Sequence, residues 1–413
     1  MSKPPLHGNK IAIKKSLLLT PENEQKTSPP KVSTATPPAI EKFIPKCKKL
    51  LGSGNSGTAV KQCYDEDCKN CRVVKTSIGS DREYREDFFR EAAIDEEVQK
   101  AAKGTAYEKL VPKFYNYFDY KTSQVIETSW NPNEGTFRDY LDRNYSTMTT
   151  HTFARILVQV FSTLSFLHEK ISFKHMDLKS DNVLIIKNDE PSFYTNFLPI
   201  TAEVDGKYKK INLAVPYSNV SAMIIDFGNS YAYDGYSSNK LTFKGTEVRK
   251  NTIYSKGSIF NGKCDFQAFD VFRWLVDIYN LCHNHRTKPL FSTFLRTLIT
   301  NVFGTFFDTV TKNSKSYNDG FQMLTANGCM ELQAHMAKHG VITYASVAKI
   351  IADIPESGII INFKFGKSDK ENDKEKENIK KRSPKRKSSP KKSYLQRSLL
   401  KLRALFDSKN SNA

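Results

Sequence analysis

The feature that most constrains this chain is the octapeptide HMDLKSDN at residues 175–182, which the apolar run VLII follows directly. It places Asp177, Lys179 and Asn182 on a short loop before an expected strand. At this spacing Asp177 can orient an attacking hydroxyl and accept its proton. Lys179 can offset charge on a transferring phosphoryl group, and Asn182 can reach a metal ion. Chance seldom supplies all of these positions in order, so the loop predicts phosphoryl-transfer chemistry.

A second acidic position ends another apolar run. The sequence IIDFG at residues 224–228 places Asp226 between an expected strand and a glycine turn. A carboxylate is the hard oxygen ligand that Mg²⁺ prefers. The motif is common by itself, but after the loop at 175–182 it predicts that Asp226 and Asn182 bind the Mg²⁺ that accompanies ATP.

A glycine-rich segment lies near the start of the expected globular region. The candidate nucleotide-binding residues in it are Gly52, Ser53, Gly54 and Gly57, in the sequence GSGNSG. Glycines let the backbone approach phosphate oxygens closely, with amide N–H groups aimed at the anion. Strand patterns on both sides favour a flap over phosphates, while an ordinary structural turn remains the alternative.

A lysine ends the next apolar strand pattern. Lys75 closes the run VVK and is predicted to hold the α- and β-phosphates of a nucleotide. A carboxylate from the helix expected at residues 80–103 would position it. Glu91 lies on the apolar face of that helix, but Asp95 and Glu97 are close enough in the sequence to remain open alternatives.

In this order the four motifs resemble the eukaryotic-type protein kinase superfamily, in particular a divergent Ser/Thr kinase similar to those of large DNA viruses. The resemblance covers about residues 46–353. It implies an α+β, bilobal protein-kinase-like fold, with a small antiparallel-sheet N-lobe that has one main helix, and a larger helical C-lobe. It also implies transfer of the γ-phosphoryl group of ATP, with Mg²⁺, to Ser/Thr hydroxyls of protein substrates.

The same resemblance implies roles for residues outside the four motifs. Glu127 and Ser129 would present backbone groups to adenine, with Ile126 at the gatekeeper position. Asp270 would brace the catalytic loop from a long central helix, and Thr246 would contact the catalytic aspartate.

Three departures from the family pattern are visible. Met176 stands where an arginine usually reads a phosphate on the activation loop, so we do not expect that switch here. No clear Ala-Pro-Glu follows Thr246. Asn182 and Asp226 are 44 residues apart, which predicts an insertion at about 187–220 with its own hairpin.

The pattern divides the chain into four parts. These are a disordered Pro/Ser/Thr-rich lead-in (1–42), the N-lobe and hinge (43–128), the C-lobe (129–355) and a basic disordered tail with a short amphipathic helix (364–413). The net charge is +19, of which residues 1–49 carry +7 and the tail +11, so the body is nearly neutral. The tail is therefore either a solvated, flexible segment or one that contacts nucleic acid or another anionic surface.

The cysteines predict a reducing environment. Seven cysteines without an export signal or an apolar span favour reduced thiols and an intracellular protein, cytoplasmic or nuclear in a host cell, or carried in a virion. Whether four of them bind zinc stays open: Cys47, Cys63, Cys68 and Cys71.

Other function classes compete with a protein kinase. A small-molecule kinase generally lacks a lysine two residues beyond the catalytic aspartate, so Lys179 argues for a peptide substrate. A pseudokinase would need one of the motif residues missing, and none is missing. A nucleic-acid-binding scaffold that acts through its basic tail is the third alternative.

Overall fold

The computed structural model describes nine segments of the chain: residues 45–53, 57–77, 82–188, 196–215, 219–232, 241–248, 267–284, 288–307 and 326–362. The predictions for the lead-in, for Gly54 and for the basic tail lie outside the described residues.

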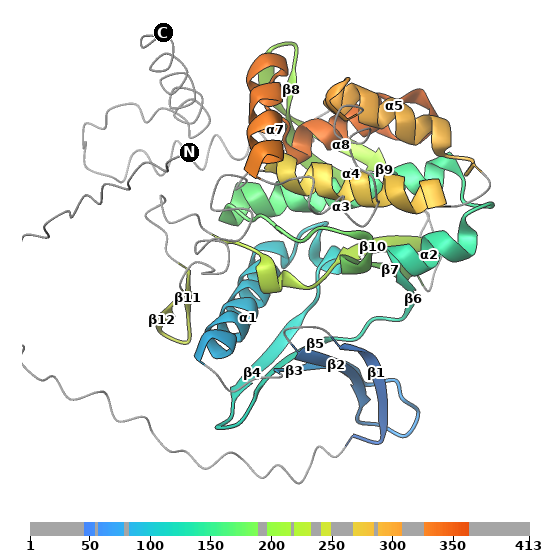
Figure 1. The fold of residues 1–413 in the computed structure, drawn as a ribbon. Helices are drawn as coiled ribbons and strands as arrows, with labels where there is room; N and C mark the ends of the chain where they lie inside the picture. The colour runs from blue at the N-terminus through green and yellow to red at the C-terminus, as the bar shows by residue number, and fades with distance from the viewer. Residues whose placement is uncertain are drawn as a thin grey trace, which may run out of the picture. The chain divides into compact units, whose positions relative to one another are not determined.

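The N-terminal part is a five-stranded antiparallel sheet in the order β1-β2-β3-β5-β4 (Figure 1). Its strands are β1 (Cys47–Ser53), β2 (Gly57–Cys63), β3 (Cys71–Ser77), β4 (Phe114–Asp119) and β5 (Gln124–Ser129). The sequence patterns predicted β1, β2 and β3, and these predictions are confirmed. They missed β4, whose aromatic and polar residues have no clean alternation.

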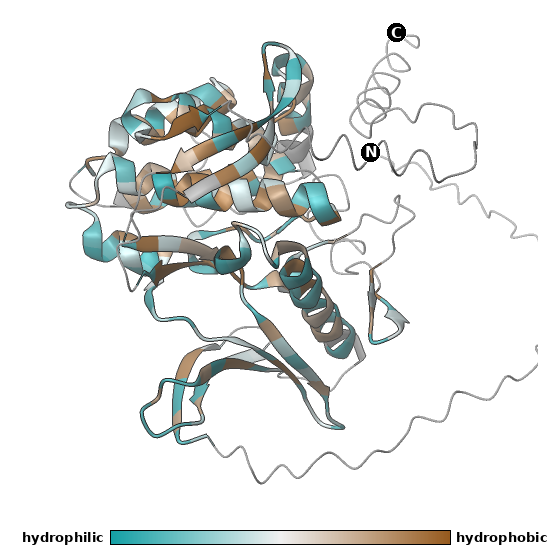
Figure 2. Cartoon of the chain, turned by 180° about the vertical axis from the view of Figure 1, so that it is seen from behind, coloured by the Kyte–Doolittle hydropathy of each residue, from teal (hydrophilic) through white to brown (hydrophobic). Residues whose placement is uncertain are grey.

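One main helix packs on this sheet. Helix α1 (Arg82–Ala102) contacts β3, β4 and β5. It buries Phe88, Ile94 and Val98. Hydrophobic and hydrophilic residues share its circumference in Figure 2, as expected for a helix with one face on a core. The helix expected at 80–103 is therefore present.

The C-terminal part is mostly helical. Its helices are α2 (Phe137–Asn144), α3 (Thr150–Ile171), α4 (Gln267–Asn284), α5 (Ser292–Phe303), α7 (Ala326–His339) and α8 (Tyr344–Asp353). Helix α3 is buried along most of its length and is capped at its N-terminus by Thr149, whose hydroxyl accepts from the backbone N–H of Thr152. With the N-terminal sheet, this arrangement confirms the predicted α+β, two-lobed fold class. No helix in the described segments is both long and apolar enough to cross a membrane.

Two small sheets complete the C-terminal part. In one, the order β10-β7-β6 joins β10 (Val220–Ile224), β7 (Val183–Lys187) and β6 (Asn133–Thr136). In the other, β8 (Asn196–Val204) and β9 (Lys207–Val215) form a hairpin, and β13 (Ile360–Asn362) pairs with β9. The hairpin lies within the segment where the sequence predicted an insertion, and Tyr107 Oη donates to the Pro199 carbonyl, 2.7 Å away.

The expectation of reduced thiols is wrong for four cysteines. Disulfides join Cys47 to Cys68 and Cys63 to Cys71, whereas Cys282 is free. Strand register places Cys63 opposite Cys71 and Cys47 opposite Cys63, while Cys68 comes from the turn between β2 and β3; register between strands cannot be read from cysteine spacing.

Candidate active site

Lys75 meets two carboxylates at the boundary between the two parts of the fold. Its Nζ lies 2.6 Å from Glu91 Oε1 on α1 and 3.0 Å from Asp226 Oδ1, which follows β10. The geometry selects Glu91 from the three candidate acids. Glu97 instead lies near Lys100, with an N–O distance of 4.0 Å.

Charge and burial compete in this cluster. Burial by itself would lower the pKa of Lys75, but the carboxylates of Glu91 and Asp226 outweigh it, so the pKa is raised. Burial would raise the pKa of Asp226, but the Lys75 ammonium outweighs it, so that pKa is lowered. Lys75 and Asp226 are therefore both charged at neutral pH. Asp95, one helical turn beyond Glu91, has its pKa raised well above the ordinary value by burial and then by Glu91.

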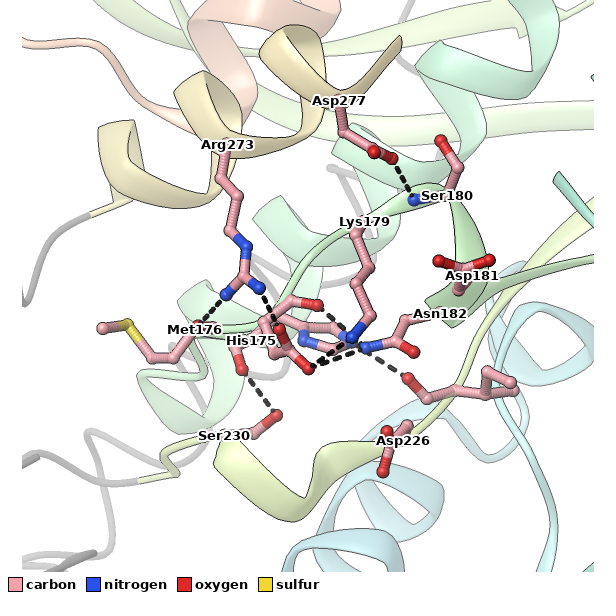
Figure 3. A network of polar contacts seen from close by, with 12 residues as sticks. His175, Met176, Lys179, Ser180, Asp181, Asn182, Asp226, Ser230, Arg273 and Asp277 are labelled. Carbon is pink, nitrogen blue, oxygen red and sulfur yellow. Dashed lines mark hydrogen bonds and ion pairs between the residues drawn. The ribbon is translucent and has the colours of Figure 1, made fainter. Parts of the chain in front are cut away.

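Two of the predicted residues of the catalytic loop, Lys179 and Asn182, contact the carboxylate of the third, Asp177, and Figure 3 shows the side-chain nitrogens of Lys179 and Asn182 close together. Asp177 Oδ2 accepts from Asn182 Nδ2 at 3.2 Å and lies 3.3 Å from Lys179 Nζ. Asn182 Nδ2 also donates to the Asp177 carbonyl at 2.9 Å, which closes the loop on itself. The Asp177 carboxylate is thus held in one orientation, as a group that must meet a hydroxyl requires.

Side chains of helix α4 hold the loop in place. The Asp270 carboxylate accepts from the backbone N–H groups of His175, at 2.9 Å, and Met176, at 2.8 Å. Asp277, two turns further along α4, accepts from the backbone N–H of Ser180 at 2.7 Å. Asp270 is fully buried, so its contacts are shielded from water. It therefore occupies the bracing place that the resemblance implied.

The two predicted metal ligands lie on neighbouring strand ends. The Ile225 N–H donates to the Asn182 carbonyl at 3.0 Å, which ties the end of β10 to the start of β7. Asp226 follows in the left-handed region at φ 63°, a conformation that costs roughly 1–3 kcal/mol for a residue other than glycine. Its side chain is 42% exposed. An amide oxygen and an accessible carboxylate are a donor set that fits Mg²⁺.

One residue of this network was not predicted from the sequence. Arg273 of α4 donates from Nη1 to the Met176 carbonyl at 3.0 Å, and its Nη2 forms an ion pair with Asp177 Oδ1. Figure 3 shows it reaching down from α4 onto the loop. A signal was available, because Arg273 follows Asp270 by three residues and so lies on the same helix face. An arginine therefore does reach the catalytic loop, although position 176 is a methionine.

The described part of the glycine-rich segment explains one glycine by packing. A Cβ at Gly57 would lie 2.4 Å from the Thr76 carbonyl oxygen of β3, so only glycine fits there. A Cβ at Gly52 would meet nothing within 4 Å. Ser53 ends β1 opposite Thr58 of β2. Thus Gly57 is required by the sheet itself, whereas Gly52 is free for another role.

The expected adenine contact of Ser129 needs correction. Strand β5 continues to Ser129, whose backbone N–H donates to the Lys113 carbonyl at 2.8 Å. The Glu127 carboxylate pairs with Arg72 at 2.7 Å within the sheet. Ile126 is buried opposite Lys75. The segment that leaves the sheet is therefore residues 130–132, beyond the position expected for the hinge.

The implied contact of Thr246 with Asp177 is also not observed. Thr246 is exposed in a hairpin of β11 (Thr242–Phe243) and β12 (Thr246–Glu247), and no hydrogen bond joins it to Asp177 in the described part of the chain. Phe243 of the hairpin instead packs against Phe89 of α1 and Tyr117 of β4, with ring centroids 5.1 and 5.7 Å apart. Residues 241–248 thus dock on α1 and β4.

Comparisons with known proteins agree with this geometry. The family model of the protein kinase domain matches residues 46–248. A mimivirus protein (Acanthamoeba polyphaga mimivirus) named as a serine/threonine-protein kinase is 33% identical over 91 residues, which cover 22% of this chain and 19% of that protein. One from Dictyostelium discoideum, with the same kind of name, is 23% identical over 222 residues, covering 54% and 35%.

The chain spans only about a fifth and a third of the length of these two relatives. Among solved structures, a crystal structure described as a kinase domain aligns with 76% of this chain and 91% of its own, at 16% identity and a TM-score of 0.37.

Proposed function

Because this chain belongs to the protein kinase superfamily, we propose that it transfers the γ-phosphoryl group of ATP to serine or threonine hydroxyls of protein substrates. The observation that carries the proposal is the convergence of Lys75 with Asp226, 151 residues away in the sequence, beside the loop that holds Asp177. Nothing in local folding requires these groups to meet, but phosphoryl transfer requires all of them in one place.

The residues divide the chemistry between binding and proton transfer. Lys75, held by Glu91, binds the phosphates as a fixed positive charge. Asp177 orients the substrate hydroxyl and takes its proton at a carboxylate oxygen, while Lys179 offsets charge on the moving phosphoryl group. Asn182 and Asp226 would hold Mg²⁺, which neutralises charge on the phosphates when bound.

One observation supports serine or threonine specificity, and a second supports a protein substrate in general. Both curated relatives carry that specificity in their names. Lys179 follows Asp177 by two residues and contacts its carboxylate, the arrangement that separates protein kinases from most small-molecule kinases. Intracellular location and an anionic partner for the basic tail remain predictions from the sequence.

The test is transfer of label from γ-labelled ATP to a mixture of Ser/Thr peptides. The wild-type protein is compared with Asp226→Asn and with a matched control, Asp205→Asn, whose side chain is 84% exposed in the turn between β8 and β9. We expect label on serine or threonine with wild type and Asp205→Asn, and its loss with Asp226→Asn. Equal labelling by all three proteins, or none by wild type, would refute the proposal.

A further inference from the structure

Four cysteine sulfurs gather at one end of the N-terminal sheet. Cys47 of β1 lies opposite Cys63 of β2, and Cys63 lies opposite Cys71 of β3. Residues directly opposite each other on antiparallel strands point to the same face of a sheet. The fourth, Cys68, comes from the turn between β2 and β3, and its sulfur is bonded to that of Cys47.

The two disulfides are therefore neighbours in one cluster. Cys71 is bonded to Cys63, yet its Sγ also lies 2.9 Å from the carbonyl oxygen of Cys68, which belongs to the other pair. Cys63 and Cys71 are buried, with 1% and 8% of their surface exposed. The sheet and its turn therefore bring all four sulfurs into one cluster, two of them from buried residues.

The turn that carries Cys68 is shaped by contacts that do not involve sulfur. The Tyr64 N–H donates to the Asn70 carbonyl at 3.0 Å. The Asp65 carboxylate accepts from the backbone N–H groups of Lys69 and Asn70, both at 2.9 Å. Because none of these hydrogen bonds involves sulfur, reduction of the disulfides does not remove them directly, and we expect the C-x-x-C segment at 68–71 to stay beside the two strands.

We propose that, in the reduced protein, these four cysteines bind one Zn²⁺ ion as a structural Cys₄ site. The ion is tetrahedrally coordinated by thiolates in such sites, and a C-x-x-C pair commonly supplies two of the ligands. While the four sulfurs are paired in disulfides, no group of three or more His, Cys, Asp or Glu side chains in the described residues is arranged to hold a metal ion, so the proposed site exists only after reduction.

The two states of the cluster differ by a balanced redox step. Two molecules of a thiol reductant reduce each disulfide, giving two cysteine thiols and the oxidised reductant. Binding of Zn²⁺ to the four thiols then releases four protons. In either state the cluster links β1, β2 and β3 at the end of the sheet opposite the glycine-rich turn. On β3, Cys71 of the cluster precedes Lys75 by four residues.

The experiment measures metal, not catalysis. The full chain is purified in a thiol reductant, and bound zinc is determined by mass spectrometry for three proteins: wild type, Cys68→Ser/Cys71→Ser, and Cys282→Ser as the control that removes a cysteine outside the cluster. We expect about one Zn²⁺ per chain in wild type and Cys282→Ser, and near none in the double variant.

A second measurement needs no variant, in case the double substitution prevents folding. Titration of the reduced, metal-free wild-type protein with Co²⁺ should give the visible bands of tetrahedral cobalt and a thiolate charge-transfer band, and Zn²⁺ should abolish both. Absence of zinc from the reduced wild type together with no cobalt spectrum would overturn the proposal. So would disulfides that persist in reductant, or zinc that remains in the double variant. Since phosphoryl transfer is not the readout, these results are independent of the proposed kinase function.

Discussion

The catalytic loop and the glycine-rich hairpin are held in opposite ways, although both belong to one proposed site. The loop is buried: His175 has no exposed surface, and Asn182 has 4%. Hydrogen bonds join its backbone to carboxylates of α4 and to the backbone at the end of β10. The hairpin strand β1 is an edge strand that exposes Leu50 and Leu51 by 62% and 40%, and of the described strands only β2 pairs with it.

This difference matches what each segment has to do. A carboxylate that takes a proton must keep its position within a fraction of an ångström, and the many buried contacts around Asp177 hold it there. A hairpin that covers phosphates must let a nucleotide enter and leave, which an edge strand with one partner allows. Substitutions in the loop should therefore slow transfer, and substitutions in the hairpin should weaken nucleotide binding.

The largest effect is expected for Asp177→Asn. Loss of the proton acceptor should lower kcat by about 10²- to 10⁴-fold, while ATP affinity changes little, because the carboxylate does not hold the phosphates. Steady-state kinetics with peptide and ATP varied separately would measure the split. An unchanged kcat would show that Asp177 takes no part in the reaction. It would also contradict the expectation that substitutions in the loop, unlike those in the hairpin, slow transfer.

The next effect is expected for Arg273→Gln. A hydrogen bond to a charged group contributes about 1.5–3 kcal/mol, so loss of the contacts to Met176 and Asp177 should lower kcat by about tenfold to a hundredfold. KM for ATP should stay near the wild-type value. The matched control is Arg296→Gln on α5, which is exposed and should leave both constants unchanged. A rise in KM with no change in kcat would contradict the positioning role of Arg273.

A pair of hairpin variants should separate packing from nucleotide binding. Gly57→Ala forces a methyl group against the Thr76 carbonyl and should cost about 1–3 kcal/mol of stability, seen as a lower Tm. Gly52→Ala meets no atom within 4 Å, so Tm should hold while KM for ATP rises. Equal melting temperatures for the two variants would show that the sheet does not need Gly57.

The smallest effect is expected for Asp95→Asn. The pKa of buried Asp95 is raised above the ordinary value of 3.8, so the folded state binds its proton more tightly than the unfolded state does. Stability therefore falls as pH rises above about 3.8, until the folded group also ionises. The asparagine removes this loss, so its advantage in Tm over wild type should be near zero at acid pH and grow toward neutral pH. An advantage independent of pH would contradict this account.

Much of the site was predictable because several of its chemical groups lie close together in short segments of the sequence. Asp177, Lys179 and Asn182 lie within six residues, so the loop alone brings them together, and the structure shows them in contact. Lys75 and Asp226 needed the order of the motifs, since no local rule connects them.

What the sequence did not predict depends on register and on packing between distant elements. The pairing of β3 with β5 decides where the sheet ends, and this moved the expected hinge beyond Ser129. Register also brought Cys47, Cys63 and Cys71 together across three strands. Arg273 was missed because its partner lies on a loop 96 positions earlier in the sequence, and only the packing of α4 reveals the contact.

The most direct test of the central claim is Mg²⁺-dependent binding of ATP measured by calorimetry on wild type, Lys75→Met and Asp226→Asn. We predict one ATP per wild-type chain in Mg²⁺, binding weakened by at least about tenfold in Lys75→Met, and loss of the Mg²⁺ dependence in Asp226→Asn. ATP binding that is absent from wild type, or equally strong and equally Mg²⁺-dependent in all three proteins, would contradict the claim that these segments form one site.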